Sequence, residues 1–77
     1  MIVMINDDGW TLATASWSVG GAPETPDRTF LSYFWGQEGK PQAWSVTLHR
    51  PVGEVLDLIR ANAAEGVCDL RPLQAPA

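Results

Sequence analysis

The stretch TFLSYFWGQEGKPQAWSVTLH, residues 29–49, decides the fold that we expect for this chain. Residues 29–35 are rich in aromatic and β-branched side chains, and residues 43–49 alternate strictly between apolar and polar types. Both patterns are typical of β-strands, and residues 38–41 between them carry glycine and proline, which favour turns. The stretch therefore predicts an antiparallel hairpin.

The register of this hairpin follows from the faces that it creates. A four-residue loop pairs the apolar side chains on one face: Trp35 with Trp44, Tyr33 with Val46 and Leu31 with Leu48. The opposite face then has three further pairs: Phe34 with Ser45, Ser32 with Thr47 and Phe30 with His49. A slip of one residue would mix the two sets, so the pattern predicts this pairing.

A second hairpin is expected at the start of the chain. Residues 2–5 form a short apolar run, and the Asn-Asp-Asp-Gly sequence of residues 6–9 has the chemistry of a tight turn. With Asp8 and Gly9 as its central pair, the turn sets three pairs: Asp7 with Trp10, Ile5 with Leu12 and Val3 with Thr14. The second strand then runs to about residue 19, and residues 20–28, with two glycines and two prolines, predict a long connecting loop.

An amphipathic helix is expected after residue 49. Pro51 suits the first helical position, and Gly66 suits the stop after the last turn. Apolar residues between them recur at intervals of 3 and 4, which predicts a buried stripe: Val52, Val55, Leu56, Ile59 and Ala63. Residues 67–71 predict a short fifth strand, parallel to the fourth through a right-handed crossover.

Together these elements predict one α+β domain over residues 1–71, followed by a flexible tail over residues 72–77. The domain is expected to be a four-stranded antiparallel meander with one amphipathic helix packed on one face and a possible short fifth strand. A chain of 77 residues has room for a single core, so the large apolar side chains supply most of its stability.

The composition argues against several classes of partner. The formal net charge is -4 and the five basic residues are scattered, so we expect no binding to nucleic acid. No apolar run approaches the roughly 18 residues of a membrane span, and residues 1–8 do not resemble a signal peptide. The single cysteine rules out an internal disulfide, which favours a soluble, cytoplasmic protein.

Candidate catalytic and metal-binding residues are few. His49 is the only side chain whose ordinary pKa lies near neutrality, and no acid is placed by the sequence to orient it. Asp7 and Asp8 beside Gly9 are turn formers, because the further acids of a calcium loop are missing. Cys68 with one histidine is no zinc ligand set, and packing is its favoured role. We therefore expect no enzyme, no metal and no cofactor.

The most informative feature is a surplus of apolar surface. One helix covers one face of a sheet, yet the face opposite to it still carries Phe30 and Phe34. Depending on strand order, Trp17 or the pair of Trp10 and Leu12 would join them. The alternative is that the sheet curls, or that residues 20–28 fold back, so that the monomer itself buries these rings.

These observations favour a small non-enzymatic protein-binding module. It would dock a partner protein, or a second copy, through the aromatic face, with five contact residues: Phe30, Phe34, Trp17, Trp10 and His49. In size, acidity and lack of motifs the chain is similar to small inhibitors, immunity proteins and regulators of phages and mobile elements. This is a resemblance of class, and it assigns no residue a role.

Two other functions stay open from the sequence. One is a small-molecule or peptide binding domain, with a cleft between the sheet and residues 20–28 that is lined by Trp10, Trp17, Tyr33 and His49. The other is strand addition, in which a partner segment pairs with an exposed edge at residues 2–5 or 67–71.

Overall fold

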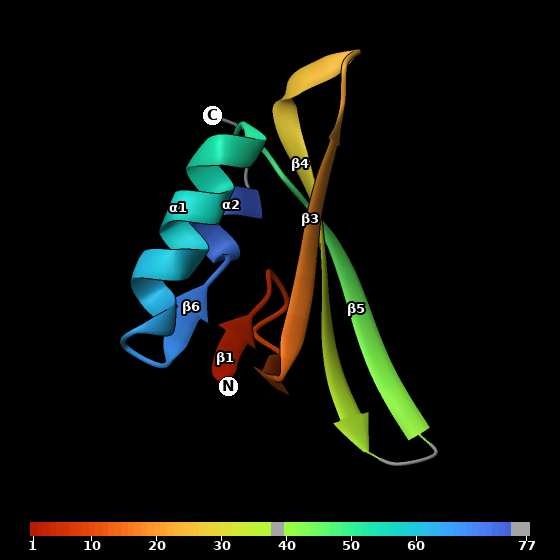
Figure 1. Ribbon diagram of the computed structural model, residues 1–77, viewed down its shortest axis with the longest axis vertical. Coiled ribbons are helices and arrows are strands. Elements are labelled where there is room, and N and C mark those ends of the chain that lie inside the picture. The colour runs from red at the N-terminus through yellow and green to blue at the C-terminus, as the bar shows by residue number, and fades with distance from the viewer. Residues whose placement is uncertain (38–39, 75–77) are drawn as a thin grey trace.

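The computed structural model describes residues 1–37 and 40–74, with the side chains of residues 1–34 and 43–74. The described residues form eight elements in chain order: β1 (Ile2–Ile5), β2 (Thr11–Thr14), β3 (Ser16–Ala22), β4 (Thr25–Gln37), β5 (Lys40–Leu48), α1 (Val52–Ala63), β6 (Val67–Asp69) and α2 (Arg71–Gln74). Figure 1 shows α1 on one side of the molecule and the long strands β3, β4 and β5 on the other. The predicted α+β class, with antiparallel strands and one helix packed on them, is confirmed.

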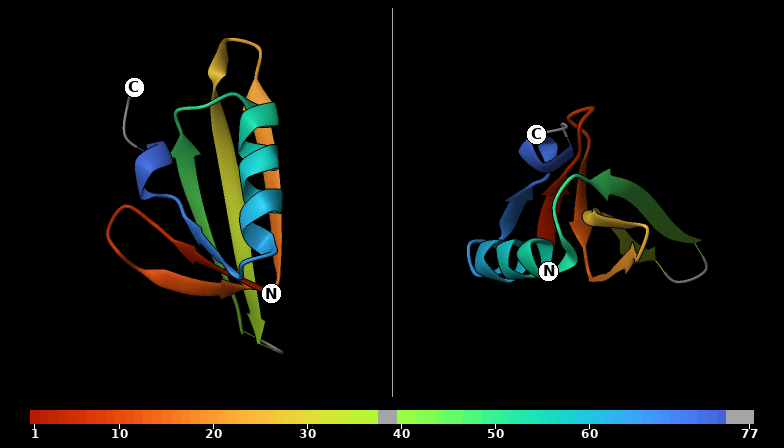
Figure 2. Two further views of the ribbon diagram at one scale, coloured as in Figure 1. Left: turned by 90° about the vertical axis from the view of Figure 1, so that its left-hand side faces the viewer. Right: turned by 90° about the horizontal axis from the view of Figure 1, so that it is seen from above.

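The strands are divided between two sheets, which the prediction of one meander did not include. One sheet has the order β2-β1-β6 and the other the order β3-β4-β5. Helix α1 lies along the longer sheet, and the short β1–β2 hairpin lies beside the lower part of the same sheet (Figure 2, left). The longer sheet therefore has an inner face toward α1 and the shorter sheet, and an outer face on the opposite side.

The division falls at Ala15, within the single strand predicted over residues 10–19. Leu12 and Thr14 are buried on β2, whereas the apolar side chains of β3, Trp17 and Val19, lie at odd positions. A continuous strand would send even and odd positions to opposite faces. The irregularity at Ala15, whose N–H donates to the Phe34 carbonyl at 2.9 Å, lets both sets point into the core.

The β1–β2 turn has one residue more than predicted, and the predicted register was wrong by one. Met4 pairs with Leu12 and Ile5 with Thr11. Gly9 has a φ of +79° and its N–H donates to the Asn6 carbonyl at 3.0 Å. The Asn6 side-chain Oδ1 also accepts hydrogen bonds from the N–H groups of Asp8 and Trp10. This is a three-residue turn with a left-handed third residue, and it brings Met4 and Leu12 to the same buried face.

A Gly9→Ala variant should lower the free energy of unfolding by about 1–2 kcal/mol, because a Cβ disfavours positive φ. No atom lies within 4 Å of a Cβ built at Gly9, so the loss measures backbone strain alone. Gly20→Ala is the matched control, since its Cβ also meets no atom and its φ is ordinary. Urea titrations of both variants check the prediction, and an equal effect of the two changes would contradict it.

The β4–β5 hairpin has the predicted faces with a register shifted by two residues. Leu31 pairs with Val46 and Tyr33 with Trp44, whereas the prediction placed Tyr33 opposite Val46. Residues 38 and 39 of the predicted turn lie outside the described residues. A shift of two returns every side chain to its own face, so the apolar pattern cannot exclude it.

Residues 20–28 were predicted to be a loop, and this was wrong. They form the ends of β3 and β4, joined by a turn at Pro23 and Glu24. Packing against α1 explains the glycine at position 21, since a Cβ there would lie 2.7 Å from the Cγ2 atom of Val52 at the start of that helix. Pro26 precedes Thr29, where pairing of β4 with β5 begins, so its missing N–H removes no bond to β5.

Helix α1 is confirmed close to its predicted ends, and only part of its predicted stripe is fully buried. Pro51 occupies the N-cap position, one residue before the predicted first helical position, and Gly66 follows the helix with a φ of +83°. Val55 and Ile59 are fully buried, and Ala63, the last residue of the predicted stripe, is exposed.

The last strand pairs differently from the prediction. Strand β6 forms, but it is parallel to β1 rather than to β5. The chain leaves α1 at Gly66, whose carbonyl accepts a hydrogen bond from the Val3 N–H at 2.9 Å, so β6 begins beside β1. Residues 72–74 of the predicted tail belong to α2, and Leu73 packs against the core. Residues 75–77 lie outside the described residues.

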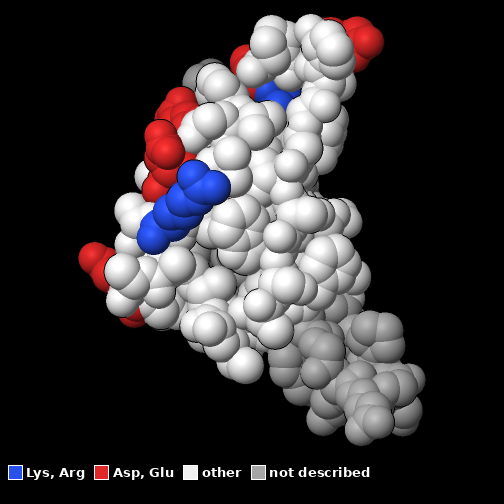
Figure 3. Space-filling view, in the orientation of Figure 1, with Lys and Arg blue, Asp and Glu red and all other residues white. Residues whose placement is uncertain are grey.

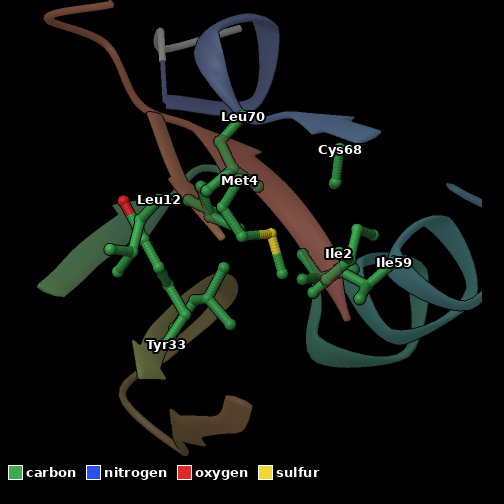
Figure 4. Close-up of a cluster of buried hydrophobic side chains, with 10 residues drawn as sticks. Ile2, Met4, Leu12, Tyr33, Ile59, Cys68 and Leu70 are labelled. Carbon is green, nitrogen blue, oxygen red and sulfur yellow. The ribbon is translucent and has the colours of Figure 1, made fainter. Parts of the chain in front are cut away.

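The core joins the two sheets and α1. Met4 lies at its centre, between residues of the shorter sheet and Tyr33 of the longer one (Figure 4). Ten hydrophobic residues are buried: Ile2, Met4, Leu12, Leu31, Tyr33, Leu48, Val55, Ile59, Cys68 and Leu70. All of them lie on the inner side of the β3-β4-β5 sheet, so nothing from this core covers the outer face.

Candidate functional site

The outer face of the β3-β4-β5 sheet is the first candidate surface. Phe30 and Phe34 project from the central strand, and Phe30 is 47% exposed. Small and hydroxyl residues flank them on both neighbouring strands: Ser16, Ser18 and Gly20 on β3, and Ala43, Ser45 and Thr47 on β5. Ser32 lies between the rings, and its Oγ is 3.1 Å from the Oγ of Ser45. The two rings therefore form a ridge along β4, and a lower row of small side chains lies on each side of this ridge.

The described part of this face around the two rings carries no charge. Its side chains from residues 16–20, 30–34 and 43–47 are aromatic, hydroxyl or small. Charged side chains gather elsewhere, over α1 and at the β3–β4 turn, as Figure 3 shows for one side of the molecule. Exposed aromatic rings without neighbouring charges are typical of the centre of a protein interface.

A groove along strand β5 is the second candidate site. It has a volume of about 460 Å³ and is lined by Asn6, Trp10 and four consecutive residues of β5: Ala43, Trp44, Ser45 and Val46. Consecutive residues of a strand point to opposite faces, so a groove that touches all four runs along the edge of the strand. Trp10 is 64% exposed, and its ring meets the Trp44 ring edge-on with centroids 6.3 Å apart.

Two hydrogen bonds show which backbone groups of β5 face this groove. The Phe34 carbonyl accepts from Ala15 on the β3 side, so Phe34 does not bond to Ala43 opposite it. At the other end, the His49 N–H points away from β4 and donates to the Leu73 carbonyl of α2 at 2.8 Å. By alternation, the N–H and C=O groups of three residues face the open edge: Ala43, Ser45 and Thr47.

Tyr33 connects the groove to the core. Its ring meets the Trp44 ring edge-on at 5.9 Å, and the hydroxyl is buried without a hydrogen-bond partner among the described residues. Figure 4 shows this hydroxyl directed away from Met4, beside Leu12. Burial raises the pKa of Tyr33; the Asn6 side chain is close enough to oppose the rise, although its geometry is not that of a hydrogen bond. The hydroxyl stays neutral at physiological pH and is available as a donor.

Known proteins assign no function to either surface. No family model, curated protein or solved structure matches this chain. The roles of its residues therefore rest on their own geometry and chemistry.

The five predicted contact residues are divided among several places. Phe30 and Phe34 share the outer face, as predicted. Trp10 lies at the groove, and Trp17 is on the inner face, where it packs partly buried against the core. His49 is half-buried after the end of β5, and its backbone is held by α2. The predicted cleft between the sheet and residues 20–28 does not form, because those residues extend β3 and β4.

Five of the six residues that line the groove were not predicted as site residues. Trp44 was assigned to the core, and it is half-buried with its ring between Tyr33 and Trp10. Asn6 was assigned to the turn, which it does cap, and Ser45 was assigned to the outer face alone. A strand edge depends on which strands pair, and no sequence pattern in this chain marks the outermost strand.

Cys68, Asp69 and Arg71 have structural roles. Burial raises the pKa of the Cys68 thiol, and the charge of Asp69 adds to the rise, so the thiol is not activated. Arg71 donates two side-chain hydrogen bonds to Asp69, at 2.9 and 2.7 Å, which hold the pKa of Asp69 below its usual range. In the described ranges, no three histidine, cysteine or acidic residues are grouped as metal ligands, and no helix is long and apolar enough to cross a membrane.

Proposed function

We propose that the protein is a small non-enzymatic protein-binding module that self-associates through the outer face of the β3-β4-β5 sheet. The observation that carries the proposal is the pair of rings on the outer face, the exposed Phe30 and the partly buried Phe34, with no charged side chain around them. The occupant that this face fits best is a second copy of the chain.

The shape of the face is complementary to itself. A second copy, turned over about a two-fold axis parallel to the strands, faces the first copy with its Phe30 level with the first copy's Phe30. A sideways displacement by one strand then seats each ridge of rings on the row of small residues beside the other ridge. Aligned sheets pack in this way at a distance of about 10 Å. A net charge of -4 on each copy opposes association, but residues 16–20, 30–34 and 43–47, which form the described part of this face around the rings, include no acidic residue.

The area of the face sets the expected affinity. The strands have 7, 13 and 9 residues. With a rise of about 3.3 Å per residue and a spacing of about 4.8 Å, they cover on the order of 450 Å². A standard interface buries about 800 Å² on each partner. We therefore expect a reversible dimer with a Kd in the micromolar range, that is, about 1–100 µM.

Sedimentation velocity between about 1 and 500 µM protein tests the proposal. The wild-type chain should change from monomer to dimer over this range, and a Phe30→Ser/Phe34→Ser double variant should stay monomeric with an unchanged circular dichroism spectrum. Trp10→Ala is the control, since it removes an exposed aromatic side chain outside the face and should dimerise as the wild type does.

Two outcomes would contradict self-association through this face. One is a wild-type chain that stays monomeric at all concentrations. The other is a dimer that survives in the double variant and is lost in Trp10→Ala. If the double variant unfolds instead, hydrogen exchange of the wild type decides, because the proposal requires concentration-dependent protection confined to the β3-β4-β5 sheet.

A further inference from the structure

We infer that the groove between the Asn6–Trp10 turn and the edge of β5 binds an extended peptide segment of a partner protein. The segment would pair with β5 as an added strand and place one large apolar side chain in the groove, against Trp10 and Trp44. This site is separate from the outer face, and the inference does not depend on self-association.

The backbone of β5 provides the first recognition element. Three alternate residues present N–H and C=O groups at the edge: Ala43, Ser45 and Thr47. Strand β5 bonds to β4 only, and no residue in the described part of the chain accepts or donates at these groups from the open side. Six such groups match the main chain of an extended segment of about five residues, which is the usual mode of strand addition.

The chain itself already uses the end of this edge. The His49 N–H, the next group in the same row, donates to the Leu73 carbonyl of α2. Helix α2 therefore covers the edge at His49, and the groove at residues 43–46 continues it in the opposite direction. The edge thus donates a main-chain hydrogen bond to a neighbouring segment in the folded protein, and a peptide would extend this arrangement.

The tryptophans provide the second element. Trp10 is held beside β5 by the turn, in which Asn6 accepts the Trp10 N–H at 3.0 Å, and its ring stands edge-on to Trp44. The Trp10 side chain is 64% exposed, its backbone is held by the turn, and its ring contacts Trp44. It therefore forms one side of the groove that needs little rearrangement on binding. The volume of about 460 Å³ has room for a leucine or phenylalanine side chain and the adjoining main chain.

Charge provides the third element. Asp7 and Asp8 are exposed in the same turn that holds Trp10. The residues of β5 that line the groove carry no charge. A segment with lysine or arginine near its apolar residue is therefore attracted to the mouth of the groove, and an acidic segment is repelled.

A capped peptide, acetyl-Lys-Val-Phe-Val-Lys-amide, is a suitable probe because its phenylalanine and both lysines point to one side of a strand. Titration into ¹⁵N-labelled protein should give saturable shifts, largest at the amides of Ala43, Ser45 and Thr47, with a Kd on the order of 0.1–1 mM. The same peptide with its three central amides N-methylated should not bind, because methylation removes main-chain donors and leaves the side chains.

Substitutions in the protein separate the backbone from the side chains. Ser45→Pro removes an N–H that faces the groove and should weaken peptide binding at least tenfold. Ser45→Ala is the matched control, since it loses the same hydroxyl and keeps the N–H, and it should bind within about twofold of the wild type. Trp10→Ala should also weaken binding about tenfold, while sedimentation of the protein alone is unchanged.

Several results would overturn the inference. They are absence of probe binding up to about 5 mM, equal binding of the N-methylated peptide, equal binding by Ser45→Pro and Ser45→Ala, or shifts confined to the outer face. A dimer of the free protein that is lost only in Ser45→Pro would assign the edge to a second copy instead. If Ser45→Pro does not fold, the comparison of the two peptides on the wild-type protein still decides.

Discussion

Replacement of Leu31 by alanine should lower the free energy of unfolding by about 2–5 kcal/mol. Leu31 is fully buried on β4, the central strand of the longer sheet, between Val19 on β3 and Val46 on β5. Truncation removes three carbons and leaves a cavity that the neighbouring strands cannot close without losing their own hydrogen bonds.

The size of this effect matters because the domain is small. A chain of 77 residues is expected to have a stability of about 4–12 kcal/mol. The variant should therefore unfold at a much lower urea concentration, and at the lower end of the range it should be partly unfolded in water. Urea titration followed by tryptophan fluorescence measures the change, with the slope m unaltered.

Ser32→Ala is the control for Leu31→Ala, because Ser32 is the next residue of the same strand and points to the outer face. It loses only the contact with the Ser45 hydroxyl and should change the stability by no more than about 1 kcal/mol. A Leu31→Ala variant as stable as Ser32→Ala would show that the inner face of the sheet is not the core.

The faces of the longer sheet could be predicted from the sequence, and its register could not. Alternation places Leu31 and Tyr33 on one side and Phe30 and Phe34 on the other, and both assignments agree with the structure. Alternation repeats every two residues, so a shift of two leaves it unchanged. Only the length of the turn distinguishes the two registers, and the predicted four-residue loop gives the wrong one.

The division into two sheets left a signal that the prediction did not use. The buried positions of β2 are even, whereas the partly buried apolar side chains of β3, Trp17 and Val19, are odd, a change that one regular strand cannot accommodate. The change marks the irregularity at Ala15, where the chain passes from the shorter sheet to the longer one. A search for such changes of parity would have separated β2 from β3.

One of the two candidate sites could be predicted from the sequence, and the other could not. Phe30 and Phe34 follow from local alternation and were predicted to share a face. The groove combines a turn, Trp10 and the edge of β5, which are more than 30 residues apart in the chain. Their proximity depends on how the two sheets meet, and local patterns carry no information about it.

Replacement of Leu70 by alanine should lower the free energy of unfolding by about 2–5 kcal/mol, although the residue lies next to the predicted tail. Leu70 is fully buried, and its N–H donates to the Ile5 carbonyl at 2.8 Å, which continues the pairing of β6 with β1. Its side chain meets Met4 in the core (Figure 4). Thermal unfolding followed by circular dichroism measures the loss, which should lower Tm by about 10 °C or more.

Val67→Ala is the matched control for Leu70→Ala, since Val67 starts β6, the strand that Leu70 directly follows, and is 46% exposed. It should lower the stability by less than about 1 kcal/mol, because most of the removed surface already contacts water. Similar small losses in both variants would mean that residues 67–74 do not complete the core. A large loss in Leu70→Ala alone is the result that the parallel pairing of β6 with β1 predicts, because that pairing directs Leu70 inward and Val67 outward.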